Sequence, residues 1–265
     1  LKYIKSVDTR VDATFGTSAI NLQNLRNEIQ RMLEMARVNV DESFDAFLAG
    51  SSKSLDDVDK REDYIDYLNK EISRAAAKMM AHEANVKASK NIGSYLDMTS
   101  NIERIGDHAV NIMESAHELH EKGLHFSGDA ANELRILCDA MMKAMGMAYS
   151  SFEKDDLMIA HQVEPLEEVV DTLNIELKNR HIKRLQEASC TVELGYVYQD
   201  LLTNIERVSD HCSNIAGAMI EIDEHENIHK YLHNIKKDDM DFQESYHKYL
   251  NHYYLELGQP EAKEA

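Results

Sequence analysis

Proline occurs only twice in this chain of 265 residues, glycine ten times and tryptophan not at all. Proline and glycine are the residues that most often interrupt helices, so their scarcity removes the usual breaks. Alternating apolar and polar residues, the pattern that indicates β-strands, are absent as well. The composition therefore predicts an all-α fold.

Basic residues are also scarce, because 29 lysines and arginines face 48 acids and give a formal charge of −19 at pH 7. A surface with this charge repels nucleic acid and anionic lipid, so nucleic acid is not expected as a partner. An acidic excess suits cations, although it also serves simply to keep a helical surface solvated.

Cysteines and long apolar runs are few too. The three cysteines, Cys138, Cys190 and Cys212, form neither a CxxC motif nor a disulfide framework. They are expected to be reduced, which points to a cytoplasmic setting. No signal peptide and no apolar run of about 18 residues is present, so nothing in the sequence is expected to span a bilayer.

Apolar spacings of three and four residues continue along almost the whole chain. They predict helices over 18–50, 55–82 and 85–121, then over 130–152, 156–188 and 191–222, with a kink expected at Pro165. "GLHFSGD" separates the two groups. We expect a junction to a missing N-terminal region over 1–17, three-helix repeats over 18–124 and 125–223, and a C-terminal helical tail over 224–265.

A duplicated motif supports the two repeats. "NIERIGDHAVNI" at 101–112 returns as "NIERVSDHCSNI" at 204–215, and the alignment of 95–112 with 198–215 contains ten identities in 18 positions. Only about one identity would be expected by chance. The fold predicted is thus two tandem three-helix bundles followed by a helical extension.

Each repeat carries acids four residues apart on its second and third helices, where they share one helix face. Two like charges at this spacing destabilise a helix unless a cation offsets them, and carboxylate oxygens suit hard metal ions. Neighbouring helices of a bundle run antiparallel, so the pairs of each repeat can face each other. The candidate metal ligands are Glu62, Asp66, Glu103 and Asp107 in the first repeat and Glu167, Asp171, Glu206 and Asp210 in the second, with Asn111 and Asn214 as supporting ligands.

The same residues allow less specific interpretations. The acids could line a solvated groove neutralised by Arg104, Arg207 and water, in a metal-free helical scaffold. His108 and His211 are expected to pack or hydrogen-bond between helices rather than to bind metal. An enzyme of the di-iron type would use Glu-x-x-His pairs, which occur at Glu114/His117, Glu226/His229 and Glu244/His247, but the duplication repeats none of them.

Paired "NIERIGDH" motifs, each preceded by a Glu-x-x-x-Asp helix, resemble the PhoU family. The resemblance covers about 18–222 and implies two three-helix bundles that bind multinuclear clusters of divalent or trivalent metal ions (Mg, Mn, Fe or Zn) and take part in phosphate homeostasis without catalysis. One departure is Ser209, which stands where the second motif of the family has glycine.

The opening "YIKSVDTRVDATFGTSAINLQNLRNEIQRMLEMA" resembles the junction after the membrane part of bacterial sodium/phosphate cotransporters. The leading expectation is therefore a regulatory, metal-binding domain of such a cotransporter, at the cytoplasmic face of the membrane, with the transporter domain of the same chain as its partner. A free-standing PhoU-type regulator of a phosphate transporter or sensor is the alternative. A homo-oligomer remains open in either case.

Overall fold

The computed structural model describes residues 15–51, 54–83, 85–224 and 239–258, and within these ranges the chain is helical without a strand. The first repeat consists of α1 (Phe15–Ala49), α2 (Leu55–His82) and α3 (Val86–Lys122). The second consists of α4 (Gly128–Lys154), the single turn α5 (Leu157–Ala160), α6 (Val163–Gln186) and α7 (Val192–Glu224). One further helix, α9 (Met240–Glu256), follows.

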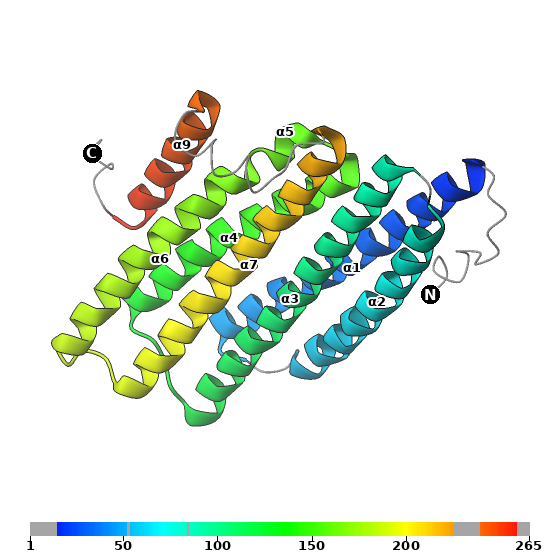
Figure 1. Ribbon diagram of the computed structural model, residues 1–265. Helices are drawn as coiled ribbons and strands as arrows, with labels where there is room; N and C mark the ends of the chain where they lie inside the picture. Colours follow the sequence, from blue (N-terminus) through cyan, green and yellow to red (C-terminus); the bar gives the residue numbers. More distant parts are fainter. Residues whose placement is uncertain (1–14, 52–53, 84, 225–238, 259–265) are drawn as a thin grey trace.

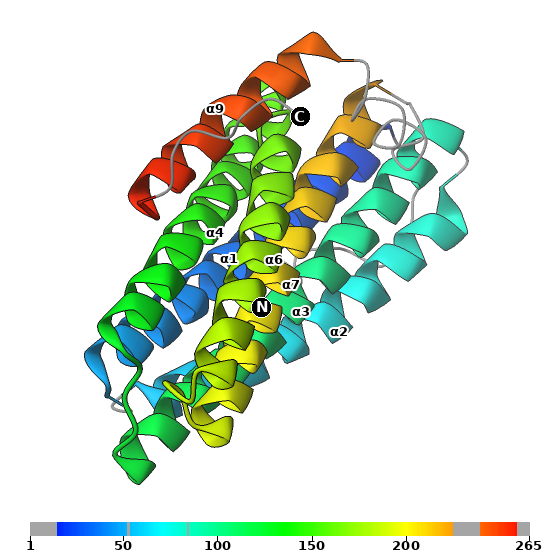
Figure 2. The same cartoon turned by 90° about the vertical axis from the view of Figure 1, so that its left-hand side faces the viewer.

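The two repeats lie side by side and are joined mainly through their third helices. Figure 1 shows α3 and α7 next to each other in the middle of the molecule, with α2 beyond α3 and α6 beyond α7. The first helices, α1 and α4, also pack against each other, and Figure 2 shows them along the same side of the bundle. The predicted fold class, two tandem three-helix bundles plus a C-terminal helix, is confirmed.

Local sequence explains where the helices near this junction begin and end. Asn85 caps α3 by accepting hydrogen bonds from the backbone N–H groups of Lys87 and Ala88 at 2.9 and 3.3 Å. Gly123 ends α3 in the left-handed conformation, with φ at +62°. Four residues later Ser127 caps α4 by accepting from the N–H of Ala130. The "GLHFSGD" link is therefore a stop signal followed at once by a start signal.

The predicted kink at Pro165 is wrong. The chain turns earlier, at His161 and Gln162, where the one-turn helix α5 ends and α6 begins. Pro165 is the third residue of α6, in the first turn, where a backbone N–H has no helical partner in any case. The proline therefore starts a helix instead of bending one.

The apolar stripes of the duplicated motif form the centre of the core, as the helical spacing predicts. Every one of their ten residues is fully buried: Met98, Ile102, Ile105, Ala109 and Ile112 on α3, and Leu201, Ile205, Val208, Cys212 and Ile215 on α7. The stripes occupy the inner faces of α3 and α7. The acids of the motif consequently lie on the flanks of these helices, toward α2 and α6.

Helix α9 covers the outer side of the second repeat, against α6 and the middle of α4 (Figures 1 and 2). Leu250 and Tyr253 are buried there, and the Tyr246 hydroxyl lies 3.1 Å from Thr172 Oγ1 on α6. Part of the predicted tail, 225–238 and 259–265, and most of the predicted junction, residues 1–14, lie outside the described residues. None of the described helices is both long and apolar enough to cross a membrane.

Candidate functional site

The acids of the second repeat come together between α6 and α7. Ligand oxygens of Glu167 and Asp171 on α6 and of Asp210 on α7 all lie within 4.8 Å of one another. Glu167 and Asp171 are one helical turn apart, and α7 runs alongside with Asp210 at the same level. Only 6% of Glu167 is exposed, so part of the cluster is shielded from water.

Repulsion between the carboxylates makes this cluster energetically unfavourable in the metal-free protein. Burial raises the pKa of Glu167 to about 10, and the charges of Glu164 and Asp171, together with a hydrogen bond to Asp210, act in the same direction. In the absence of a cation, Glu167 therefore keeps a proton at neutral pH. A metal ion would remove this cost by replacing the proton as the positive charge between the carboxylates.

The fourth predicted acid of this repeat lies slightly apart. The Glu206 side chain accepts a hydrogen bond from Asn174 Nδ2 at 3.2 Å, one turn further along α6 than Asp171. Glu206 therefore faces α6, as the sequence predicted, but no three-ligand group of the described residues includes it.

Two further acids extend the cluster and were missed by the sequence prediction. Oxygens of Glu164 and Glu168 lie within 4.8 Å of one another and of a Glu167 oxygen, and Glu164 accepts a hydrogen bond from the Ser213 hydroxyl on α7. A signal was present in the duplication. The positions equivalent to Glu164 and Glu168 in the first repeat are Asp59 and Asp63, so acids occur in both copies.

The acids of the first repeat also face one another, across α2 and α3, but more openly. Burial raises the pKa of Glu62, of Glu103 and of Asp107, and neighbouring acids raise it further, which for Asp107 means Asp66 on the opposite helix. The Asp66 carboxylate pairs with Lys70 at 2.7 Å. Within the described residues, no three ligand atoms of this set approach one another as closely as those of the second repeat do.

The donor set of both clusters suits hard cations. Carboxylates on two rigid helices offer oxygen ligands without nitrogen or sulfur, which favours Mg²⁺, Mn²⁺ or an iron ion over softer metals. The residues that would hold such ions are Glu167, Asp171 and Asp210 in the second repeat and Glu62, Asp66, Glu103 and Asp107 in the first. Arg207 Nη1 contacts Asp210 at 3.2 Å, so the alternative of a groove neutralised by arginine has some structural basis.

The histidines of the motif bond between helices, as the sequence predicted. His108 Nδ1 lies 2.8 Å from Asn204 Oδ1, and His211 Nδ1 lies 2.9 Å from Asn101 Oδ1. Asn111 also belongs to this α3–α7 contact, because its Nδ2 donates to Asn204 Oδ1 at 3.2 Å. The structure therefore places Asn111 toward α7 and away from the carboxylates of α2. The corresponding Asn214 is exposed on α7.

Asp200 holds the asparagine of this contact in place. Its Oδ2 accepts from Asn204 Nδ2 at 3.2 Å and lies 3.4 Å from the Ser115 hydroxyl on α3. This arrangement leaves Asn204 Oδ1 free to accept from His108 and Asn111. The Asn and His of both motif copies thus join the two repeats, while the Glu and Asp of the same motif face outward toward α2 and α6.

These features define a class of protein: a duplicated three-helix bundle with a carboxylate cluster between the second and third helices of each repeat. The family model of the PhoU domain matches residues 29–116 and 134–219, one stretch in each repeat. The chain belongs to the PhoU family.

Individual relatives agree with this assignment. The chain is 24% identical over 213 residues to the phosphate-specific transport system accessory protein PhoU homolog 1 of Thermotoga maritima, covering 80% of this chain and 91% of the relative. It is 22% identical over 202 residues to the corresponding PhoU homolog of Clostridium acetobutylicum, of which it covers 91%. The crystal structure of PhoU from Pseudomonas aeruginosa superposes with a TM-score of 0.74, at 21% identity over 80% of this chain and all of that one, which establishes the shared fold.

The leading functional expectation, a cytoplasmic domain of a sodium/phosphate cotransporter, is wrong. These relatives are free-standing accessory proteins, and the alignments extend over nearly their whole length. That expectation depended on the first residues of the chain, whereas the fold of the duplicated bundle is shared with the crystal structure of PhoU from Pseudomonas aeruginosa. The comparisons support the alternative, a PhoU-type regulator.

Proposed function

We propose that the chain is a PhoU-type regulator of phosphate uptake that acts through a phosphate transporter or sensor, at the cytoplasmic face of the membrane, and that it binds hard metal ions at its two carboxylate clusters. The family membership and the names of the relatives support the first part. Regulation in this proposal requires binding and contact, not catalysis. The Glu-x-x-His pair at Glu114 and His117 does not belong to any three-ligand group of the described residues.

One observation supports the metal-binding part most directly. Three carboxylates from two helices, with Glu167 nearly inaccessible to water, are held within 4.8 Å of one another, and Arg207 contacts one of them, Asp210, at 3.2 Å. Such a concentration of like charge destabilises the fold unless a cation or protons neutralise it. A regulator that uses metal for structure or for partner binding would retain this arrangement, whereas a scaffold would have no use for it.

Metal content tests this proposal. Replacement of Asp107 and Asp210 by Asn removes one charge from each cluster while nearly preserving shape, and should sharply reduce bound metal with little change in helicity. Asp45 and Asp223 are exposed acids outside the clusters, so the Asp45→Asn/Asp223→Asn variant provides a control with the same change of charge. Elemental analysis of the purified proteins is the measurement. Equal metal content in the two double variants would contradict metal binding and support the alternative in which the acids line a solvated groove.

Regulation is tested in cells. Deletion of the gene should disturb the response of phosphate uptake to external phosphate. The wild-type chain and the control variant should restore it, and the Asp107→Asn/Asp210→Asn variant should restore it less. Uptake of labelled phosphate is the measurement. If deletion leaves uptake unchanged at both low and high phosphate, the regulatory part of the proposal fails, independently of metal binding.

A further inference from the structure

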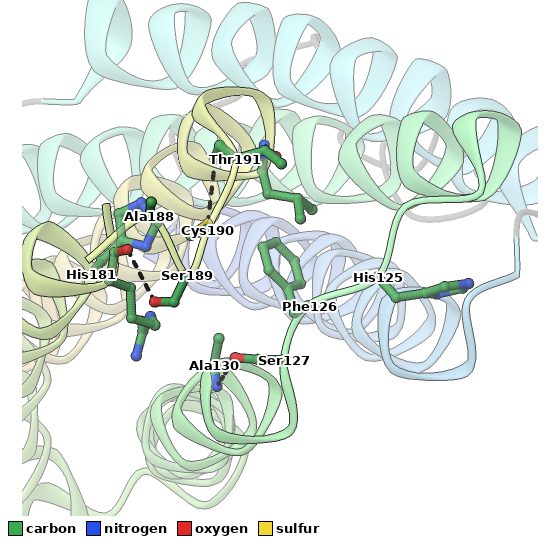
Figure 3. Close-up of a pocket in the computed structure, with 11 residues that line it drawn as sticks. His125, Phe126, Ser127, Ala130, His181, Ala188, Ser189, Cys190 and Thr191 are labelled. Carbon is green, nitrogen blue, oxygen red and sulfur yellow. Dashed lines mark hydrogen bonds between the residues drawn. The ribbon is translucent and has the colours of Figure 1, made fainter. Parts of the chain in front are cut away.

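A recess elsewhere in the molecule is lined by residues of the opposite character to those of the acid clusters. It opens between the α3–α4 link and the α6–α7 turn, has a volume of about 210 Å³, and includes Phe126, Ser127, His181, Arg184 and Ser189 in its lining. We call it the end pocket. Figure 3 shows Phe126, Ser127 and Ser189 around the opening, with Thr191 beyond them and His125 pointing away.

The end pocket contains no acid among its lining residues, although the chain has 48 acids. Arg184 supplies a positive charge, and Ser127, Ser189 and Thr191 supply hydroxyl groups. Two long helices begin at its wall: Ser127 caps α4, and α7 starts directly after Thr191. Helix N-termini carry partial positive charge and attract anions.

His181 is the observation that points to a missing ligand. The residue is only 4% exposed, its side chain lines the end pocket, and neither ring nitrogen has a hydrogen-bond partner among the described residues. Its ring stacks on Tyr198, with centroids 4.6 Å apart, so it is held in one orientation. A buried polar ring without a partner is costly, and a ligand that accepts a hydrogen bond would remove the cost.

The neighbouring Glu133 pairs with Arg184 and with a second arginine. This buried carboxylate contacts Arg184 at 2.8 Å and Arg180 at 3.4 Å, and it accepts a hydrogen bond from the Tyr198 hydroxyl at 2.8 Å. Its charge is shared by two guanidinium groups, and one of them, that of Arg180, also pairs with Glu176 at 3.0 Å. The Nε of Arg184 is buried and has no hydrogen-bond partner among the described residues.

The α6–α7 turn places the hydroxyl groups at the rim. Ala188 adopts a left-handed conformation with φ at +53°, and the Ser189 N–H donates to the Arg184 carbonyl at 2.9 Å. This closes α6 as a glycine would and turns 189–191 over the pocket. A metal ion is not the expected ligand, because no three metal-binding side chains of the described residues meet here.

We propose that the end pocket binds a small tetrahedral oxyanion, with inorganic phosphate as the ligand to test. A volume of about 210 Å³ is below that of pockets for drug-sized ligands and fits a small ion. Arg184 and the two helix N-termini provide positive potential, and His181 and the hydroxyl groups of Ser127 and Thr191 provide directed hydrogen bonds; the Ser189 hydroxyl donates to the Arg184 carbonyl at 3.0 Å. This site is separate from the carboxylate clusters, so the chain would bind the anion and the metal ions at different sites.

Calorimetry with inorganic phosphate tests the site on metal-free protein, because bound metal would attract phosphate by itself. Ser189→Asp puts a negative charge at the rim, and Gln186→Glu puts the same charge on an exposed residue outside the lining. We expect saturable one-to-one binding by the wild type and Gln186→Glu, and at least about tenfold weaker binding by Ser189→Asp. The Asp107→Asn/Asp210→Asn variant should bind phosphate like the wild type, so this proposal and the metal proposal fail separately.

The reactivity of the Cys190 thiol offers a test of phosphate binding that needs no mutation. It lines the end pocket and is partly exposed, whereas Cys138 and Cys212 are buried. Millimolar phosphate should slow the reaction of this one thiol with a thiol reagent, while chloride at equal ionic strength should not. Absence of saturable phosphate binding by the wild type, equal weakening in Ser189→Asp and Gln186→Glu, or unchanged binding in Ser189→Asp would each overturn the proposal.

Discussion

The imidazole rings of His108 and His211 stack on each other where α3 packs against α7, with centroids 5.6 Å apart and planes inclined by 23°. Each ring bonds through Nδ1 to an asparagine of the opposite helix, Asn204 or Asn101. Because the asparagine oxygen can only accept, Nδ1 carries the proton in both rings. The two repeats are therefore joined by the same bond made twice.

Replacement of Asn204 by Ala should destabilise the protein by about 1–3 kcal/mol, because it leaves the donors of His108 and Asn111 without their acceptor. Asn101→Ala removes the acceptor of His211 alone and should cost less. Urea unfolding of both variants is the measurement. A loss below about 0.5 kcal/mol for Asn204→Ala, the usual range of a surface substitution, would contradict this role.

Glu167→Gln should stabilise the metal-free protein and weaken metal binding. Folding raises the pKa of Glu167 from 4.5 to about 10, so the folded chain holds a proton that the unfolded chain releases. The stability of the wild type should therefore fall as pH rises from about 4.5 toward 10. The variant should lose this slope and gain on the order of 1–2 kcal/mol at pH 8.

Thermal unfolding across this pH range, in the presence of a chelator, is the measurement. Glu187 is exposed at the end of α6, so Glu187→Gln is the control and should leave the pH slope in place. A slope for Glu167→Gln that equals or exceeds that of the wild type would contradict the proposed burial of this carboxyl group.

Gly123 and Ala188 both adopt the left-handed backbone conformation, so adding a side chain at the first and removing one at the second should change stability in opposite directions. Gly123→Ala should lower stability by about 1 kcal/mol, because an L side chain is strained at φ +62°. Ala188→Gly should relieve the same strain at φ +53° and be neutral or stabilising. Denaturant unfolding checks both, and equal effects of the same sign would show that the backbone relaxes at these positions.

Leu250→Ala should loosen α9 without unfolding the repeats. Leu250 is buried against the second repeat, and its loss should cost about 2–3 kcal/mol of docking free energy. Hydrogen exchange should then become faster in α9 and stay unchanged in α3 and α7. Leu255 lies on the same helix but is 58% exposed, so Leu255→Ala should have little effect.

The sequence was sufficient to predict the helices, the duplication and the core, because these depend on periodicities that repeat along the chain. Met98 and its equivalent Leu201 are apolar at every required spacing and are both fully buried. The interhelical role of His108 could be predicted for the same reason, since its direction on α3 follows from 3.6 residues per turn. Pro165 was misread because its effect depends on where the helix begins, and that is set by the preceding turn.

The remaining site features required tertiary structure. Asn111 was expected beside the carboxylates, but one helical turn carries its side chain far enough around α3 to reach Asn204 instead. The end pocket joins His181 to Ser127, residues more than fifty positions apart in segments without a common period. No spacing rule connects them. The choice of a transporter-linked protein failed because it relied on an N-terminal stretch instead of the bundle.

The reciprocal pairs His108–Asn204 and His211–Asn101 have the geometry of an isologous interface, in which two identical surfaces meet around a twofold axis. A half-length ancestor could have formed this interface as a homodimer, and fusion of its two genes would have made the association permanent. Fusion also ends the requirement for identity. Gly106 in one copy corresponds to Ser209 in the other, and the open acid cluster of the first repeat differs from the closed one of the second. A single polypeptide can thus carry two carboxylate clusters of different geometry, whereas a symmetric dimer would carry two identical ones.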